Sequence, residues 1–331
     1  MSPKKYTISK PLLDLRMTLG EGCVWDSRSQ RLYFVDIDLN TVYVYDPNQD
    51  KYGYSHFDKN VTAIALLEGQ EGLVASIEDN FAFITPSSLP QPLLHRSQPP
   101  EEQGALVSAE KQYVVIPTST VSILPTEARL NEGAVDPSGR FLAGTMGKEF
   151  GSHNGRMWSL RPAVDGKGWD APLVYDNITC TNGMAWTDAG EKMYFTDSWV
   201  KEIVTFDYDI EQGTMSNRRV FSDISASEYG YPDGLCLDDQ GGVWTARWSA
   251  GKVLRLNPKT AKIDVEIDIP SSWNVTCCIF GGKNLDVLYI TTARCSQSGD
   301  SPPDRTELGK LYSIEGLGYR GVERGRFKGT F

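Results

Sequence analysis

The feature that most constrains this chain is a repeat in which a polar residue beside a glycine precedes a β-like run by about ten residues. The polar-glycine motif occurs as Gly20-Glu21-Gly22, Asn131-Glu132-Gly133, Thr181-Asn182-Gly183 and Pro232-Asp233-Gly234. The runs that follow are rich in the β-branched and aromatic residues typical of strands. Such a chain builds one structural unit several times.

Two further segments complete the series, and the six β-like runs begin near residues 32, 73, 141, 193, 243 and 288. Turns with Asp and Gly separate the strands, and capped stretches with helical period are scarce. We therefore predict an all-β chain, folded as a six-bladed β-propeller that spans 1–331 as one domain. The proline-containing stretch around 86–104 is predicted to be a loop insertion. Gly309–Ile314 is predicted to be the third strand of the last blade, with Lys5–Ile8 as the closing strand.

The overall charge and the cysteine pattern narrow the class of protein. The net charge of −10 argues against binding a nucleic-acid backbone. The sequence contains no apolar run of about 18 residues, so no membrane span is predicted. The N-terminus lacks the apolar core of a signal peptide. The six cysteines form no Cys-x-x-Cys pair, which favours a reduced protein of the cytoplasm. We expect a monomer or weak dimer.

Each repeat has one residue at or just before the start of its first strand, a position called here the polar station. The polar stations are candidate metal ligands, because the first strand of each propeller blade lines the central channel. The six stations are Glu21, Thr62, Glu132, Asn182, Asp233 and Thr276. The carboxylates of Glu21 and Asp233 and the amide oxygen of Asn182 suit one divalent cation with room left for water or substrate. The competing interpretation is that these residues only shape turns, where Asn-Gly and Asp-Gly are common. A polar residue at the same position in four repeats favours a metal-binding site over this alternative.

The chain also resembles a known family, the regucalcin-like senescence-marker-protein/gluconolactonase/luciferin-regenerating-enzyme-like proteins. The resemblance covers nearly the whole chain. It rests on Gly20–Asp26, Arg129–Gly133, Asp136–Arg140, Thr181–Gly183, Pro232–Gly234 and Cys278–Gly282. It implies a six-bladed propeller, with Glu21, Asn182 and Asp233 as metal ligands. It also implies that Arg129, Asn131 and Glu149 contact a sugar-lactone substrate.

The chain departs from the family pattern at Glu132, where relatives often have Asp, and in the loops 150–156, 225–231 and 295–307. These loops leave the identity of the sugar open. Glu132 is interpreted as a neighbour of the substrate residues, and the vicinal Cys277-Cys278 pair as core. Trp199 and Trp248 are candidates for flanking the sugar.

The function that these residues predict is hydrolysis of a sugar-derived lactone by a metal-dependent aldonolactonase, with Asp233 as general base. The cation is Ca²⁺, Zn²⁺, Mg²⁺, Mn²⁺ or Fe²⁺. None of the three histidines occupies a station, which disfavours a histidine base. Two alternatives stay open: an organophosphate-type hydrolase that uses the same metal site, and a calcium-binding propeller without enzymatic activity.

Overall fold

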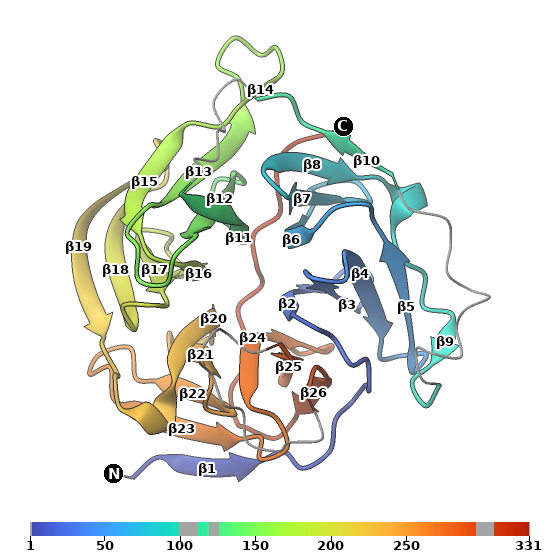
Figure 1. Cartoon of the computed structure of the whole chain (residues 1–331), viewed down its shortest axis with the longest axis vertical. Helices are drawn as coiled ribbons and strands as arrows, with labels where there is room; N and C mark the ends of the chain where they lie inside the picture. The colour runs from blue at the N-terminus through green and yellow to red at the C-terminus, as the bar shows by residue number, and fades with distance from the viewer. Residues whose placement is uncertain (1, 99–111, 119–125, 296–307, 331) are drawn as a thin grey trace.

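Six small β-sheets surround a common axis in the computed structural model, which describes residues 2–98, 112–118, 126–295 and 308–330. Figure 1 shows the sheets as blades of a ring, with the first strand of each blade nearest the middle. These six inner strands contact their neighbours in a closed circuit, from β2 through β6, β11, β16, β20 and β24 back to β2. The predicted six-bladed β-propeller is therefore confirmed.

The blades follow one another along the chain. Blade one contains β2 (Gly20–Asp26), β3 (Arg31–Asp36), β4 (Thr41–Asp46), β5 (Lys51–His56) and β9 (Leu94–His95). Blade two contains β6 (Val61–Leu66), β7 (Leu73–Ile77), β8 (Asn80–Ile84) and β10 (Tyr113–Val115). Blade three contains β11 (Glu127–Val135), β12 (Phe141–Gly147), β13 (Gly155–Pro162), β14 (Trp169–Asp170) and β15 (Leu173–Ile178).

The other three blades complete the ring. Blade four contains β16 (Thr181–Trp186), β17 (Lys192–Asp197), β18 (Glu202–Asp209) and β19 (Thr214–Ser222). Blade five contains β20 (Tyr231–Leu237), β21 (Val243–Trp248), β22 (Lys252–Leu256), β23 (Ile263–Asp268) and β1 (Lys4–Thr7). Blade six contains β24 (Asn274–Gly281), β25 (Val287–Ala293) and β26 (Leu311–Ile314). Two short 3₁₀ helices in the described ranges are η1 (Pro86–Ser88) and η3 (Ser227–Tyr229).

The β-like runs of the sequence repeat form the second strand of every blade: β3, β7, β12, β17, β21 and β25. These strands are buried on both faces, because adjacent blades pack against each other. Large side chains fill the space between blades, among them Trp158 and Trp244, which are almost fully buried. Burial on two faces explains why these runs read as continuous apolar stretches rather than as alternating ones.

A break in strand register marks each inner strand at the polar station. The pairing with the second strand shifts between Glu21 and Val24 in β2, and between Pro232 and Leu235 in β20. Equivalent shifts occur in β6, β11, β16 and β24. An irregularity of this kind turns side chains out of the normal alternation. Beside these breaks lie Glu21, Asn182 and Asp233, which line one pocket.

The ring closes differently from the prediction. The last blade has β26 as its third strand, as expected, but β1 pairs in parallel with β23 of blade five rather than with blade six. Lys5 and Glu266 form an ion pair across that pairing. Blade six instead receives Leu13, which forms an antiparallel bridge with Leu311. The open outer edge of blade five takes the N-terminal strand, and the residues that follow it close the ring.

The C-terminal segment crosses the ring at the end where the inner strands finish (Figure 1). Gly321 bridges to Asp238, directly after β20, and Phe327 bridges in parallel to Leu67, directly after β6. Arg326 donates a 2.5 Å hydrogen bond to Asp26, the last residue of β2. The polar stations lie near the opposite ends of these strands, so the two ends of the channel differ.

The proline-containing insertion leaves blade two after β8 and returns to it as β10. Its described part includes η1 and β9, which pairs with the outer strand β5 of blade one. Residues 99–104 of the predicted insertion lie outside the described residues. Nowhere in the described ranges is there a helix long and apolar enough to cross a membrane.

Candidate functional site

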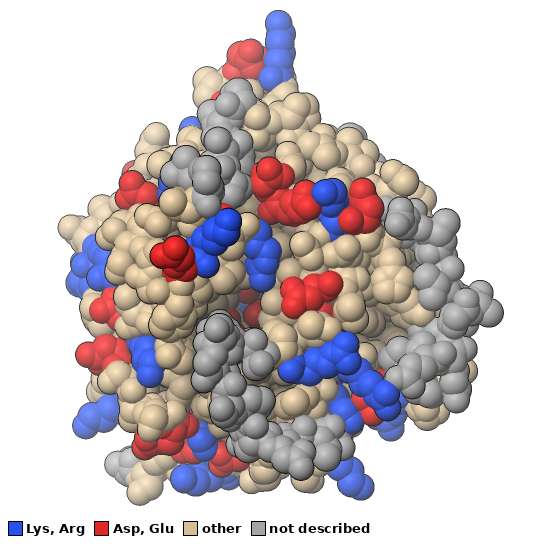
Figure 2. All heavy atoms as spheres, in the orientation of Figure 1, with Lys and Arg blue, Asp and Glu red and all other residues tan. Residues whose placement is uncertain are grey.

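A pocket of about 250 Å³ opens where the inner strands begin. Five of the six site residues predicted from the sequence line it: Glu21, Arg129, Asn131, Asn182 and Asp233. In the view of Figure 2, acidic and basic side chains both border the hollow near the centre of the ring. The bulged starts of four different inner strands therefore bring residues far apart in the sequence to one place.

The three predicted metal ligands are buried, and two of them carry an oxygen atom without a hydrogen-bond partner among the described residues. Glu21, Asn182 and Asp233 are 8%, 5% and 4% exposed. Within the described structure, Asn182 Oδ1 and Asp233 Oδ1 have no hydrogen-bond partner. Glu21 Oε2 accepts the adjacent Gly22 N–H, at 3.2 Å. Leaving a buried acceptor unsatisfied costs about 1–3 kcal/mol. This set of oxygens fits a divalent cation, which would supply the missing interactions.

The charges of the site repel one another. Burial raises the pKa of Glu21 well above its usual value, and the charges of Asp233, Cys277 and Glu132 raise it further. Burial and the charge of Glu132 likewise raise the pKa of Asp233. Several carboxylates crowded in a region of low dielectric are stable only with protons or a cation among them.

Two buried aspartates hold the chain just before the ligand candidates. Asp36 accepts the backbone N–H groups of Thr18 and Leu19, at 2.8 and 3.0 Å. Asp197 accepts the backbone N–H groups of Thr179 and Cys180, at 3.1 and 3.0 Å. Burial raises the pKa of both carboxyl groups, although these hydrogen bonds oppose the rise. Asp36 and Asp197 thereby fix the starts of β2 and β16.

Arg129 and Asn131 are held together beside the ligand candidates. Arg129 Nη1 donates to Asn131 Oδ1 at 2.5 Å and to Leu130 O at 3.1 Å. Asn131 Nδ2 donates to Thr181 O at 2.8 Å, which ties blade three to blade four. Burial lowers the pKa of Arg129, but a guanidinium stays protonated at neutral pH. A fixed cationic donor therefore faces the pocket.

Glu149 is exposed and does not line the pocket. The next residue, Phe150, packs its ring 5.1 Å from Trp199 and 6.0 Å from Tyr231. Because both partners line the pocket, the loop that carries Glu149 borders its rim. The loops 150–156 and 225–231 thus contribute to the rim or the wall. Of the third variable loop, Cys295 lines the pocket and residues 296–307 lie outside the described residues.

Several lining residues were missed by sequence reasoning, among them Asp38, Cys180 and Ser198. Asp38 and Ser198 follow the second strands β3 and β17, whereas the predicted metal ligands all lie on first strands. Asp38 comes two residues after Asp36, and Ser198 comes directly after Asp197. An aspartate at the end of a second strand is therefore a sequence signal that could have identified both residues. Trp199 and Trp248, proposed from the sequence as flanks of the sugar, do line the pocket. Their indole N–H groups have no partner among the described residues.

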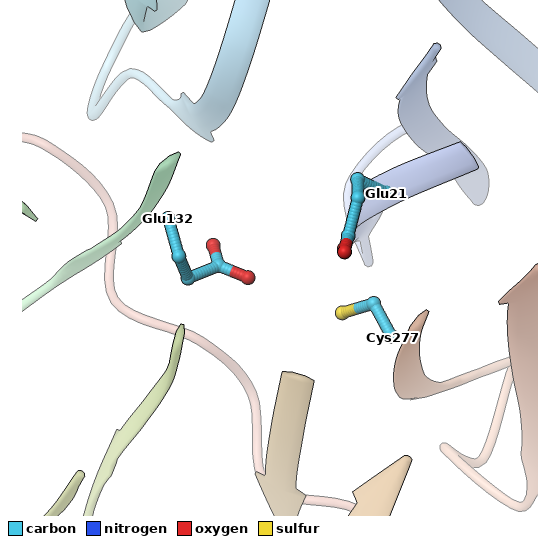
Figure 3. Close-up of side chains that lie close together, drawn as sticks. All are labelled: Glu21, Glu132 and Cys277. Carbon is cyan, nitrogen blue, oxygen red and sulfur yellow. The ribbon is translucent and has the colours of Figure 1, made fainter. Parts of the chain in front are cut away.

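Glu132 lies elsewhere than the sequence interpretation placed it. Its carboxylate faces Glu21 and Cys277 inside the channel (Figure 3), and it is not among the residues that line the pocket. Cys278 is core, as expected, and its thiol lies 3.8 Å from Trp244 O. Cys277 is core as well, and its thiol also lies near Glu21 and Glu132 (Figure 3). Cys277 and Cys278 pair in regular succession with Thr291 and Ile290, so the alternation of the strand points their side chains to opposite faces.

A six-bladed propeller with an acidic channel beside a polar pocket is the class that fold and site define. The chain belongs to the SMP-30/Gluconolactonase/LRE-like family, whose model matches residues 19–294. Regucalcin from Macaca fascicularis is 32% identical over 308 residues, covering 92% of both chains. Regucalcin from Xenopus laevis is 29% identical over 318 residues, covering 94% of this chain and 95% of that protein.

Solved structures agree with this assignment. A luciferin-regenerating enzyme superposes with a TM-score of 0.81 at 30% identity, covering 95% of this chain and 96% of its own. A calcium-binding protein, regucalcin, from Agrobacterium tumefaciens superposes with a TM-score of 0.79 and covers 99% of this chain and 100% of its own. At 20% identity, that second likeness bears on the fold alone. The family as a whole supports hydrolysis of a sugar lactone in general terms.

Proposed function

We propose that this protein is a metal-dependent aldonolactonase that hydrolyses a sugar-derived lactone to the sugar acid. The observation that carries the proposal is the pair of buried, unpartnered oxygens, Asn182 Oδ1 and Asp233 Oδ1, in the pocket that Glu21 also lines. Unsatisfied buried acceptors are rare in folded proteins and call for an explanation. Their clustering with the buried carboxylate of Glu21 supports a cation held by Glu21, Asn182 and Asp233.

When bound, the ion supplies Lewis acidity that polarises the lactone carbonyl and lowers the pKa of a water molecule. Asp233 is the proposed general base, and its unpartnered Oδ1 accepts the proton of the attacking water. Asn182 and Glu21 hold their oxygens beside Asp233 throughout. The proton on Asp233 then passes to the ring oxygen that leaves when the carbon–oxygen bond breaks.

The remaining pocket residues support a polyhydroxylated substrate. Arg129 carries N–H donors beyond those bonded to Asn131 and Leu130, and these donors are proposed to bind sugar hydroxyls. Glu149 is proposed to accept a hydroxyl from the rim. Trp199 and Trp248 combine apolar ring faces with unpartnered N–H groups, a combination that suits a sugar ring. A fixed arginine is less suited to an apolar organophosphate.

The decisive experiment compares a panel of aldonolactones with an organophosphate triester, using full-length protein stripped of metal and reloaded with single divalent ions. Hydrolysis is followed by acid release. The reloaded protein is expected to hydrolyse a lactone, and Asp233→Asn to lose roughly 10²- to 10⁴-fold in rate. Asp239→Asn, an exposed carboxylate in the same blade, is the matched control and should keep the wild-type rate.

Circular dichroism and melting temperature establish that each variant is folded. Undiminished lactone hydrolysis by folded Asp233→Asn, or by metal-free protein, would contradict the proposal. Faster turnover of the triester than of every lactone would contradict the assigned substrate class.

A further inference from the structure

A second group of metal-binding side chains lies in the channel outside the pocket. One ligand atom each from Glu21, Glu132 and Cys277 lie within 4.8 Å of one another. The three residues come from β2, β11 and β24, in three different blades, and their side chains point toward one another in Figure 3. They are 8%, 5% and 1% exposed. Of the three, only Glu21 also lines the pocket.

The two carboxylates of this cluster lack the partners that buried charges normally have. Glu132 Oε1 accepts the adjacent Gly133 N–H at 2.9 Å, just as Glu21 accepts that of Gly22. In the part of the chain that the structure describes, neither carboxylate has a Lys or Arg nitrogen within ion-pair distance. Burial raises the pKa of Glu132 despite the positive charge of Arg324 nearby. Arg324 Nη2 donates a hydrogen bond to Leu235 O, at 2.8 Å.

Asp233 provides an independent sign that a cation belongs in this part of the channel. It is 4% exposed and its Oδ1 has no partner among the described residues. Its neighbour Gly234 packs directly on the thiol, since a Cβ at Gly234 would lie 2.7 Å from Cys277 Sγ. That contact brings the backbone next to Asp233 against the Cys277 thiol.

The donor set determines which ion would bind. Ca²⁺ and Mg²⁺ take oxygen ligands, whereas Zn²⁺, Co²⁺ and Cd²⁺ accept sulfur together with carboxylate. We propose that Glu21, Glu132 and Cys277 form a second cation-binding site that takes a borderline or soft divalent ion. Glu21 would be a ligand both of this site and of the cation site proposed in the pocket. When the Sγ–metal bond forms, the Cys277 thiol releases its proton to solvent. This site extends the metal centre of the proposed function, but it is tested without any measurement of lactone hydrolysis.

The test uses the full-length, metal-free, reduced protein titrated with Co²⁺ and followed by absorption spectroscopy and equilibrium dialysis. Wild-type protein is expected to develop a thiolate-to-cobalt charge-transfer band in the near ultraviolet. Cys277→Ser should lack the band and bind one fewer equivalent of Co²⁺. Glu132→Gln should need at least roughly tenfold more Co²⁺ to reach the same band. Cys278→Ser, which removes the neighbouring thiol on the other face of β24, should keep the band.

If Cys277→Ser does not fold, as judged by circular dichroism, Cys277→Ala serves in its place and Glu132→Gln tests the same site independently. The proposal is overturned if wild-type protein binds Co²⁺ without the band, or if the band persists when Cys277 is replaced. Lactone hydrolysis without the band would leave the proposed function intact and reject the second cation site. The charge-transfer band without lactone hydrolysis would support the second cation site and reject the proposed function.

Discussion

The amide nitrogen of Asn182 donates a 2.7 Å hydrogen bond to Ser198 Oγ, while Asn182 Oδ1, in the same pocket as Glu21 and Asp233, has no partner among the described residues. Ser198 in turn donates a 2.7 Å hydrogen bond to Pro232 O, the carbonyl directly before Asp233. One hydroxyl therefore fixes the orientation of one ligand candidate and the backbone position of another. Such supporting partners commonly set the affinity of a metal site.

Replacing Ser198 by Ala should weaken metal binding, because the Asn182 amide loses the partner that orients it. The expected loss is roughly tenfold to a hundredfold in affinity, measured by calorimetric titration of metal-free protein. The control is Ser159→Ala in blade three, since this buried hydroxyl has no partner among the described residues. Equal affinities for both variants and wild type would show that Ser198 does not position the site.

Replacing Arg129 by Lys should lower kcat/KM for the lactone by roughly tenfold to a hundredfold. Lys keeps the charge but loses the planar fork that bonds Asn131 and reaches the substrate at the same time. Steady-state kinetics on the best aldonolactone measures the effect. Arg320→Lys, an exposed change in the C-terminal segment, should leave kcat/KM unchanged. A wild-type value for Arg129→Lys would remove this residue from the proposed substrate site.

The rim loop gives a third prediction, on substrate affinity. Phe150 is 61% exposed yet packs on Trp199 and Tyr231, so Phe150→Ala should release the loop that carries Glu149. Both Phe150→Ala and Glu149→Gln are expected to raise KM several-fold with a smaller change in kcat. Val164→Ala, at a loop position that is 93% exposed, provides the comparison. Unchanged KM in both rim variants would place the substrate away from this loop.

The ion pair between Asp26 and Arg326 gives a prediction about stability and pH. Partial burial raises the pKa of Asp26, but hydrogen bonds from Arg326 and Ser29 outweigh it and hold the pKa below its usual value of 3.8. Because the folded-state pKa is depressed, the stabilisation is complete well above pH 3.8 and is lost as the pH falls through the folded-state value. Protonation of Asp26 would thus loosen the C-terminal segment from blade one.

Asp26→Asn should therefore lower the free energy of unfolding at pH 7 by about 1–3 kcal/mol, and the difference from wild type should shrink in strong acid. Urea unfolding of both proteins at several pH values measures this. Asp239→Asn again serves as the control. A difference that is the same at every pH would mean that the charge of Asp26 is not the cause.

Local pattern was enough to predict the blades. The β-like runs near 193 and 243 form β17 and β21, since burial between two blades selects apolar, β-branched and aromatic residues. The pattern also singled out Glu21, Asn182 and Asp233, which line one pocket. These features are readable because each depends on a few neighbouring residues repeated along the chain.

Tertiary structure alone decided which blade β1 joins, because a four-residue strand carries no signal that distinguishes the open edges of two neighbouring blades. It also decided that the buried side chains of Glu132 and Cys277 meet that of Glu21 in the channel. That convergence depends on bulges in separate strands and on closure of the ring, which brings together positions 21, 132 and 277. The sequence by itself determined the repeated unit and its polar station. Only the closed ring determined which stations meet, because contacts between distant blades exist only once all six have packed.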